Sequence, residues 1–350
     1  MRTREVTSTL AQVRYGMEKG WHTGAQVYAS VGGRVLIDVA VGEARPGVPM
    51  TTATIVEWAS ATKAVVCVGL GLLWQRGLLD LDDPVGLHIP EFVAAGKETV
   101  TVRHLLTHTG GLTSTITDIV PPGEMVAAIC AAPMADGWIL GERCAYNSVA
   151  LWIVAELISR VSGRPFVEFV RDEVFEPAGM HDSWIGMPTA TYQAERDRIA
   201  VIAGFAPSGT EAWVTWVRPT GGGHGPIAEL GRFYEALLDG RLLSAPTLAE
   251  MTARQLHGVR DECLNETVDR GLGFHLGSSN PAHGYGSRAS DQAFGHGGRT
   301  WSLAFADPPK QLVVAVYWNG MADADIHAQR LPALLDALYD DLGDDLMAGE

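Results

Sequence analysis

Residues 60–76 are apolar on nearly every face of a helix, and no other feature constrains the fold as strongly. The central run, residues 64–74, carries no charged side chain. It is far shorter than the roughly 18 residues that a membrane-spanning helix needs, and a helix that is apolar all round is otherwise buried. The sequence therefore predicts a central buried helix, ended by Gly77, around which the rest of the chain must pack.

The chain is large enough to surround such a helix. Its 350 residues are 47% hydrophobic and 19% charged, which excludes a disordered or collagen-like protein. Lysine and arginine number 26 against 41 for aspartate and glutamate, so 26 − 41 gives a net charge of −15. Because such a surface repels phosphate backbones and anionic lipids, we expect neither nucleic acid nor a membrane as a partner.

The N-terminal segment and the cysteines bear on the compartment. The segment MRTREVTSTLAQV lacks the apolar core and the cleavage site of a secretory signal. The cysteines are widely spaced and form no CxxC pair; they are Cys67, Cys130, Cys144 and Cys263. Reduced, packed thiols are the usual state of such residues inside cells. These features predict a cytoplasmic protein.

Strand signals gather at the two ends of the chain, and helix signals gather in its middle. Strand-type runs at residues 26–31 and 34–41 flank a Gly32-Gly33 pair that predicts a hairpin turn. Later runs of strand type cover residues 213–217, 273–276, 301–305 and 312–318. Helical periodicity marks residues 6–19 and 149–162 and a C-terminal segment with leucines at 331, 334, 335, 338 and 342. We expect one sheet built from both chain ends, flanked by the first and last helices.

Ser60-Ala61-Thr62-Lys63, at the start of the predicted buried helix, is the quartet with most chemical content. A spacing of three residues is close to one helical turn, so the Ser60 hydroxyl and the Lys63 amine would share a face. A lysine on so apolar a helix is partly desolvated, which helps it to accept or relay the serine proton. The alternative is a helix cap followed by a lysine whose amine reaches solvent. The quartet alone does not separate the two.

Further segments follow the quartet in a fixed order. They are GLLDLDDPVGLHIPEF from Gly77, TVRHLLTHTGGL from Thr101, Tyr146-Asn147-Ser148, GGGHGPIAELGRFYEALL from Gly221, and FGHGGRTWSLAFADP from Phe294. Over residues 5–345 this set resembles the penicillin-recognising serine enzymes, the group of class C β-lactamases, serine DD-peptidases and family VIII carboxylesterases. The resemblance implies a mixed α+β, β-lactamase/transpeptidase-like fold. Residues 1–78 and 199–350 would form an α/β lobe with an antiparallel sheet, residues 79–198 a mainly helical lobe, and the active site would lie in the cleft between them.

The same resemblance implies roles for individual residues. Ser60 would be the acylated nucleophile, with Lys63 and Tyr146 as the proton-transfer pair. A phenol ordinarily ionises near pH ~10, so Tyr146 needs neighbouring positive charge, which Lys63 and His296 would supply. Ser148, Gly297, Gly298 and Arg299 would contact the substrate, Arg299 through a backbone N–H that completes an oxyanion hole with the N–H of Ser60. We expect residues 296–305 to form one continuous strand.

Two departures from the family pattern affect the expected substrate. Ser148 stands where the family has an asparagine amide that contacts the acyl group, and we expect the adjacent Asn147 to point elsewhere. His296 replaces a lysine whose permanent charge would hold a β-lactam carboxylate. These changes favour an ester and argue against an efficient β-lactamase.

Other signals are weaker. His104 and His108 are four residues apart, but HLLTH lacks the glutamate of HExxH, so no metal is expected. The glycines around His224 lack a following Lys-Ser/Thr and predict a turn lining the cleft rather than a phosphate cradle. Five tryptophans are candidates either for the core or for an apolar substrate pocket: Trp58, Trp138, Trp152, Trp213 and Trp301.

Together these observations predict a serine hydrolase that cleaves a small ester, as a carboxylesterase does, through an acyl-enzyme on Ser60, without a cofactor. Acyl transfer to a natural-product acceptor is the nearest alternative, because the same acyl-enzyme serves both reactions. Hydrolysis of D-amino-acid amides or peptides, weak β-lactam hydrolysis, and a non-catalytic ligand-binding module are further alternatives. The expected partner is a small-molecule ester or amide, and the oligomeric state stays open.

Overall fold

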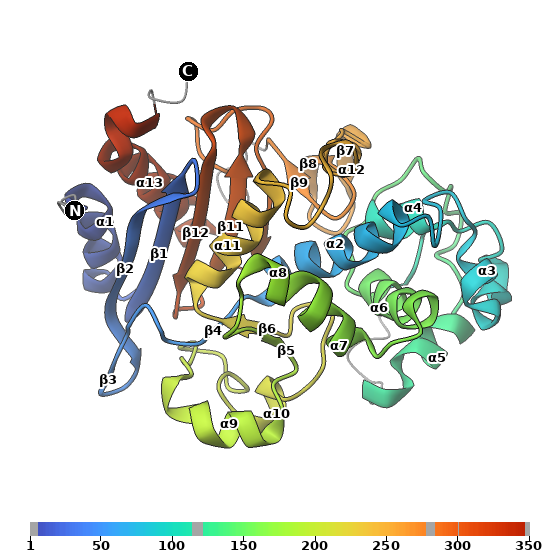
Figure 1. Cartoon of the computed structure of the whole chain (residues 1–350), viewed down its shortest axis with the longest axis horizontal. Coiled ribbons are helices and arrows are strands. Elements are labelled where there is room, and N and C mark those ends of the chain that lie inside the picture. The colour runs from blue at the N-terminus through green and yellow to red at the C-terminus, as the bar shows by residue number, and fades with distance from the viewer. Residues whose placement is uncertain (1–5, 114–121, 278–283, 300, 347–350) are drawn as a thin grey trace.

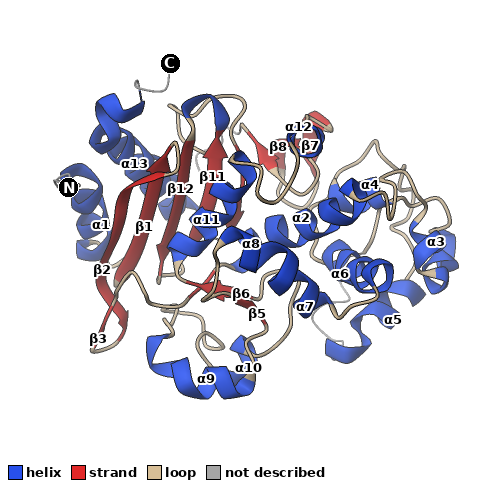
Figure 2. Cartoon of the chain, viewed as in Figure 1, coloured by secondary structure: helices blue, strands red, loops and turns tan. Residues whose placement is uncertain are grey.

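The computed structural model describes residues 6–113, 122–277, 284–299 and 301–346 (Figures 1 and 2). The helices in these residues are α1 (Thr7–Glu18), η1 (Ala59–Ala61), α2 (Thr62–Gln75), α3 (Val85–His88), η2 (Pro90–Gly96), α4 (Val102–Leu106), η4 (Pro122–Glu124), α5 (Met125–Ala131), α6 (Val149–Ser162), α7 (Phe166–Val170), η5 (Arg171–Phe175), α8 (Glu176–Ala178), α9 (Thr189–Glu195), η6 (Arg196–Arg198), α10 (Glu211–Val214), α11 (Ile227–Leu238), α12 (Ala245–Met251), η7 (Pro308–Lys310), α13 (Ala324–Leu342) and η8 (Gly343–Leu346). The strands are β1 (Gly24–Val31), β2 (Arg34–Arg45), β3 (Val48–Pro49), β4 (Val56–Glu57), β5 (Trp184–Ile185), β6 (Gly223–Gly225), β7 (Leu256–Asp261), β8 (Glu266–Arg270), β9 (His275–Leu276), β10 (Phe294–Gly298), β11 (Ser302–Asp307) and β12 (Leu312–Trp318). Among the described residues, no helix is both long enough and apolar enough to cross a membrane.

The main sheet joins the two ends of the chain. Its strand order, β3-β2-β1-β12-β11-β10-β9-β8-β7, places the N-terminal β1 directly beside the C-terminal β12. Every pairing in it is antiparallel, with Val27 opposite Val316 and His296 opposite Ala304. The Gly32-Gly33 turn between β1 and β2 has positive φ at both residues, as a two-residue hairpin of this twist requires. The predicted mixed α+β fold with this antiparallel sheet is confirmed.

Helices cover both faces of this sheet (Figure 1). Alternate side chains of β12 point to opposite faces, as the pleat dictates. Val314, Val316 and Trp318 pack with α1 and α13, whereas Val313, Ala315 and Tyr317 belong to the larger core that contains α2, α6 and α11. Because both faces are buried, β12 reads as a continuous apolar run rather than an alternating one.

The predicted central helix is α2, and it is buried over residues 62–73. It packs between α6, α7, α12 and β10, so each of its faces meets protein, as its composition demands. The helix begins two residues later than expected. Ser60 lies in the short 3-10 turn η1 (Ala59–Ala61), and Ala59 has a φ of 46°.

Two sequence expectations, for residues 213–217 and 296–305, are wrong in detail. A strand was expected over residues 213–217, but residues 211–214 form helix α10. The aromatic and β-branched side chains there pack from a helix and a loop rather than from a strand. The strand expected over residues 296–305 ends at Gly298; Arg299 has a φ of 48°, and β11 runs back antiparallel to β10. Strand β5 lies within the segment expected to be mainly helical, and it pairs with β6 in a small sheet of order β4-β6-β5.

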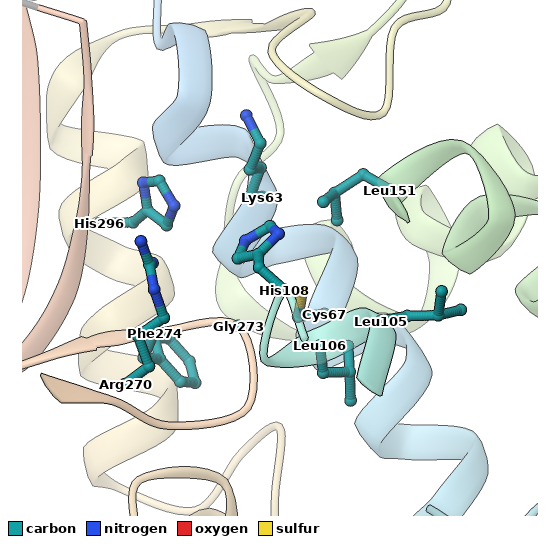
Figure 3. Close-up of a pocket in the computed structure, with 10 residues that line it drawn as sticks. All are labelled: Lys63, Cys67, Leu105, Leu106, His108, Leu151, Arg270, Gly273, Phe274 and His296. Carbon is teal, nitrogen blue, oxygen red and sulfur yellow. The ribbon is translucent and has the colours of Figure 1, made fainter. Parts of the chain in front are cut away.

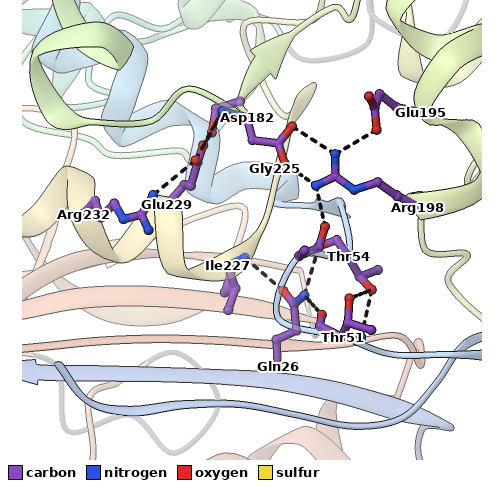
Figure 4. A network of polar contacts seen from close by, with 12 residues as sticks. Gln26, Thr51, Thr54, Asp182, Glu195, Arg198, Gly225, Ile227, Glu229 and Arg232 are labelled. Atoms are coloured by element: carbon purple, nitrogen blue, oxygen red, sulfur yellow. Dashed lines mark hydrogen bonds and ion pairs between the residues drawn. The ribbon is translucent and has the colours of Figure 1, made fainter.

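A buried amide joins the sheet to the segment that leads to Ser60 (Figure 4). Gln26, 1% exposed on β1, donates to the carbonyls of Thr51 (2.7 Å) and Thr54 (2.9 Å) and accepts from the N–H of Ile227 (2.9 Å). Beside it, the Glu229 carboxylate accepts from the N–H of Asp182 at 3.0 Å. The segment preceding β4 is therefore fixed to β1 and close to the N-terminus of α11.

Candidate active site

Ser60 and Lys63 form a direct hydrogen bond at the N-terminal end of α2. Lys63 Nζ donates to Ser60 Oγ at 2.8 Å and to the carbonyl oxygen of Thr220 at 2.7 Å. Lys63 is only 1% exposed. Since a carbonyl can only accept, one N–H of Lys63 points at Thr220, and this contact holds the amine within hydrogen-bond distance of the serine oxygen.

The Tyr146 ring lies against this pair. Lys63 Nζ is 5.0 Å and the Arg270 guanidinium carbon 5.3 Å from the centre of the ring. Three imidazoles surround it, with ring centroids at 4.9 Å (His108), 6.1 Å (His296) and 6.2 Å (His275). The Tyr146 ring is therefore flanked by the Lys63 amine and the Arg270 guanidinium, whereas the sequence argument named Lys63 and His296.

A buried carboxylate holds the loop that carries Tyr146. Both oxygens of Asp261 accept from the N–H of Tyr146, at 3.0 and 3.1 Å, and one of them is paired with Arg270 at 2.7 Å. The side chains of Asp261 and Arg270 are 0% and 2% exposed. Burial alone would raise the pKa of Asp261, but the charge of Arg270 and the N–H donors hold that pKa below its usual range.

A pocket of about 200 Å³ opens on these groups. Its lining residues are Ser60, Tyr146, Leu264, His275, His296, Gly297 and Arg299. His296 Nδ1 lies 2.7 Å from the carbonyl oxygen of Gly297, so Nδ1 carries a hydrogen and donates it to that oxygen. The site thus brings together strand β10, the η1 turn and the loop before α6.

A second, much smaller cavity of about 10 Å³ lies behind Lys63 (Figure 3). Lys63, His108, Arg270 and His296 line it, together with Cys67 and leucine side chains of α4 and α6. Burial, followed by the charges of Arg270, Lys63 and His296, lowers the pKa of His108 well below its usual range. His108 is therefore neutral and adds no third cation beside Tyr146.

The structure brings most of the expected site residues together. The larger pocket is lined by five of them: Ser60, Tyr146, His296, Gly297 and Arg299. Lys63 does not line it but is hydrogen bonded to Ser60. Ser148 and Gly298 are not among the lining residues. Ser148 occupies the N-cap position of α6, and Asn147 turns back to accept from the N–H of Ala150 at 3.1 Å, away from the pocket as expected.

Gly298 acts through packing. A Cβ at this position would lie 2.1 Å from the carbonyl oxygen of Trp58 and 2.2 Å from Ser302 Oγ. These two atoms are hydrogen bonded to each other at 2.6 Å, which ties β11 to the segment just before Ser60. Only glycine allows this approach.

We predict that Gly298→Ala lowers the free energy of unfolding by about 1–3 kcal/mol, because the methyl group must push the η1 turn away from the sheet. Urea unfolding measures the loss. Gly123→Ala is the matched control, since nothing lies within 4 Å of a Cβ there. Equal stabilities of the two variants would contradict the packing role.

The sequence argument missed Thr220, Asp261, Leu264, Arg270 and His275 as parts of the site. Asp261 and Arg270 meet only because β7 and β8 pair as a hairpin, and nothing local marks either residue. The paired histidines do not converge on a metal. His104 Nδ1 lies 3.1 Å from the N–H of Thr101 in a capping box, and the described part of the chain holds no cluster of metal ligands.

The antiparallel sheet, the buried helix and the position of Ser60 and Lys63 at its start are the arrangement expected of the β-lactamase/transpeptidase-like fold. The family model described as Beta-lactamase matches residues 11–339, and the chain belongs to that family. It is 27% identical over 339 residues to the esterase/beta-lactamase LipL of Mycobacterium tuberculosis, covering 82% of this chain and 75% of LipL. It is 28% identical over 168 residues to penicillin-binding protein 4* of Bacillus subtilis, and spans only 37% of that protein.

Solved structures agree on the fold. A penicillin-binding protein homologue from Caulobacter crescentus superposes with a TM-score of 0.82 and 28% identity, covering 96% of this chain and 97% of the other. A family VIII carboxylesterase superposes with a TM-score of 0.83 and 25% identity, covering 97% and 98%. The β-lactamase/transpeptidase-like fold expected from the motif order is therefore confirmed.

Proposed function

We propose that this protein is a carboxylesterase-like hydrolase that cleaves a small ester through an acyl-enzyme on Ser60. The observation that carries the proposal is the 2.8 Å hydrogen bond from the buried Lys63 amine to Ser60 Oγ, at the edge of a pocket that also exposes Tyr146 and His296. A serine hydroxyl becomes an effective nucleophile only when a positioned group takes its proton.

In the proposed mechanism, Tyr146 in its phenolate form accepts the Ser60 proton while Oγ bonds to the ester carbonyl carbon. Lys63 donates to both Ser60 and Thr220, so its role is to hold the serine oxygen and to supply positive charge beside the phenolate. The N–H groups of Ser60 and Arg299 would stabilise the oxyanion. Collapse of the intermediate breaks the bond to the alkoxide, which takes the proton from Tyr146.

Water then attacks the acyl-enzyme, releases the acid and restores Ser60. Tyr146 removes a proton from this water and returns one to Ser60 as the acyl bond breaks. Because an alcohol or amine can replace the water without any change of catalytic group, acyl transfer to such an acceptor is the second candidate function.

The pocket favours an ester over a peptide or a β-lactam. Asn147 is turned into the α6 cap, and Ser148 does not line the pocket, so neither offers the acyl group an amide contact. His296 is 3% exposed and stands where the family has a lysine, so the permanent charge of an ammonium group is absent at this position. The name of the family VIII carboxylesterase supports an ester substrate, and LipL is named both as an esterase and as a β-lactamase.

Mass spectrometry of the intact protein tests the proposal. Incubation with an activated aryl ester should add one acyl group, mapped to Ser60 by peptide analysis, and Ser60→Ala should carry none. Ser8→Ala is the matched control, because Ser8 lies on α1 and does not line the pocket. A protein that forms no adduct with esters, amides or β-lactams would favour a non-catalytic ligand-binding module instead.

A further inference from the structure

A continuous row of aromatic rings lies next to the pocket. Trp301, Phe205, Trp213 and Trp216 follow one another with ring centroids 5.6, 5.2 and 5.8 Å apart. We call these four residues the aromatic wall. Phe205, Trp213 and Trp216 are half-buried, whereas Trp301 is 1% exposed. Two of the tryptophans that the sequence left between core and pocket, Trp213 and Trp301, thus belong to one surface.

Two arginines lie on the aromatic wall. The guanidinium carbon of Arg218 is 3.6 Å from the ring centroid of Trp213, and that of Arg299 is 5.4 Å from the centroids of both Phe205 and Trp301. Arg299 also lines the pocket that contains Ser60. Its φ of 48° turns the chain out of β10 at this point, and the two rings then support the guanidinium beside the pocket.

Among the described residues, two basic side chains at the pocket, Lys63 and Arg299, have no carboxylate partner, and only Arg299 is exposed. Glu57 faces Arg218 at 3.4 Å and accepts from Trp213 Nε1 at 2.9 Å, and Asp261 neutralises Arg270. Lys63 is engaged by Ser60 and Thr220. Arg299 is exposed, and no carboxylate in the described ranges forms an ion pair with it. A protein of net charge −15 therefore presents an uncompensated guanidinium at its candidate active site.

Buried donors nearby also lack acceptors. Trp216 Nε1, Trp301 Nε1 and Arg218 Nε are each shielded from solvent and hydrogen bonded to nothing among the residues that the structure describes. Trp301 is 1% and Arg218 is 7% exposed. Because these three donors are shielded, what the region offers a ligand is the exposed guanidinium of Arg299 and the half-buried rings of Phe205 and Trp213, which suit a negative charge on an apolar body.

We propose that Arg299 and the aromatic wall bind a carboxylate-bearing, largely apolar portion of the substrate. The inference rests on the proposed function, which it deepens by naming the substrate class as anionic esters. It also reverses the expectation that the pocket lacks a permanent positive charge for a carboxylate. In this proposal Arg299, three residues after His296, supplies that charge. Arg299 thereby combines a backbone N–H for the oxyanion with a side chain that selects the substrate.

Two matched ester pairs test the inference by the release of the nitrophenol. The first compares 4-nitrophenyl 4-carboxybenzoate with its neutral methyl ester, so that the charge lies in the acyl part. The second compares 3-carboxy-4-nitrophenyl benzoate with its methyl ester, so that the charge lies in the leaving group. The readout is the ratio of kcat/KM within each pair, in which any change to the shared oxyanion hole cancels.

We expect the wild-type protein to favour the acid in at least one pair, and Arg299→Met to lower that ratio about tenfold, as the loss of a charge-assisted hydrogen bond at an exposed site predicts. Arg299→Lys should keep part of the ratio. Arg14→Met, which removes an exposed arginine from α1, should leave it unchanged. Raising the salt concentration should weaken the preference in the wild type.

The outcomes separate the two proposals. Acylation of Ser60 by the esters with the same ratio in the wild type and Arg299→Met would overturn the anionic subsite and leave the proposed function standing. A preference that Arg14→Met lowers equally would trace to net charge and would also overturn the subsite. Failure of every ester to acylate Ser60 would overturn both.

Discussion

Replacing Tyr146 by phenylalanine should lower the rate of Ser60 acylation by about 10²- to 10⁴-fold, the range that a positioned general base contributes. The ring would still fill the space between Lys63 and His108, so folding should be unaffected. What disappears is the phenol oxygen that takes the serine proton. Stopped-flow measurement of nitrophenol release in the first turnover reports this step directly.

The control for Tyr146→Phe is Tyr15→Phe, which removes a phenol hydroxyl from a 46% exposed residue on α1. That variant should acylate at the wild-type rate, and thermal unfolding should show both variants folded. If Tyr146→Phe acylated within a few-fold of the wild type, Lys63 would have to be the base, and its two hydrogen bonds as a donor would need another explanation.

Replacing Asp261 by alanine should cost about 3–5 kcal/mol of folding stability, because it leaves the buried charge of Arg270 without its partner. It also removes the acceptor for the N–H of Tyr146 and for those of Cys263 and Leu264, the last of which lines the pocket. Urea unfolding monitored by tryptophan fluorescence measures the loss of stability. Acylation should fall as well, since the Tyr146 loop loses its anchor.

Glu262→Ala is a matched control one residue away. Glu262 pairs with Arg143 at the surface, where both side chains are about 40% exposed (42% and 38%), so its loss should cost less than about 1 kcal/mol. Replacing Asp261 and Arg270 together, by alanine and methionine, should recover part of the stability lost in Asp261→Ala. Equal costs for Asp261→Ala and Glu262→Ala would show that the buried pair does not stabilise the fold.

The same pair predicts a dependence on pH. The pKa of Asp261 is lower in the folded chain than in the unfolded one, so its contribution is fully present above the ordinary carboxyl pKa. It is lost as the pH falls through the lowered value. Asp261→Ala should therefore differ from the wild type most near neutral pH and least in acid.

Segments whose composition leaves no alternative were predictable from the sequence. Helix α6 (Val149–Ser162) and strand β12 (Leu312–Trp318) have the bounds that their patterns indicate, because the one is amphipathic up to Gly163 and the other is too rich in β-branched residues for a helix. The strand expected around Trp213 was wrong. Large aromatic side chains favour a strand locally, whereas the hydrogen bond that holds Trp213 in α10 goes to Glu57, in a distant part of the chain.

The candidate site was predictable only in part, because some of its residues meet through tertiary contacts rather than through a local sequence motif. Ser60, Lys63 and Tyr146 lie in motifs, and the structure brings them together. Thr220, Asp261 and Arg270 meet them through strand pairing and a single carbonyl contact, which no local pattern encodes. The turn at Arg299 was missed because β10 and β11 both read as strand, and their apolar runs conceal the reversal between them.

That reversal bears on how such a protein changes its substrate. The two strands that it joins are locked by five consecutive register positions, and Ser302 is tied to the backbone just ahead of Ser60. The frame that places the nucleophile is thus separate from the side chain of Arg299, which projects from the end of the hairpin. A substitution at position 299 therefore changes substrate specificity without moving the catalytic groups. Closely related chains can in this way differ in substrate while they keep the same reaction mechanism.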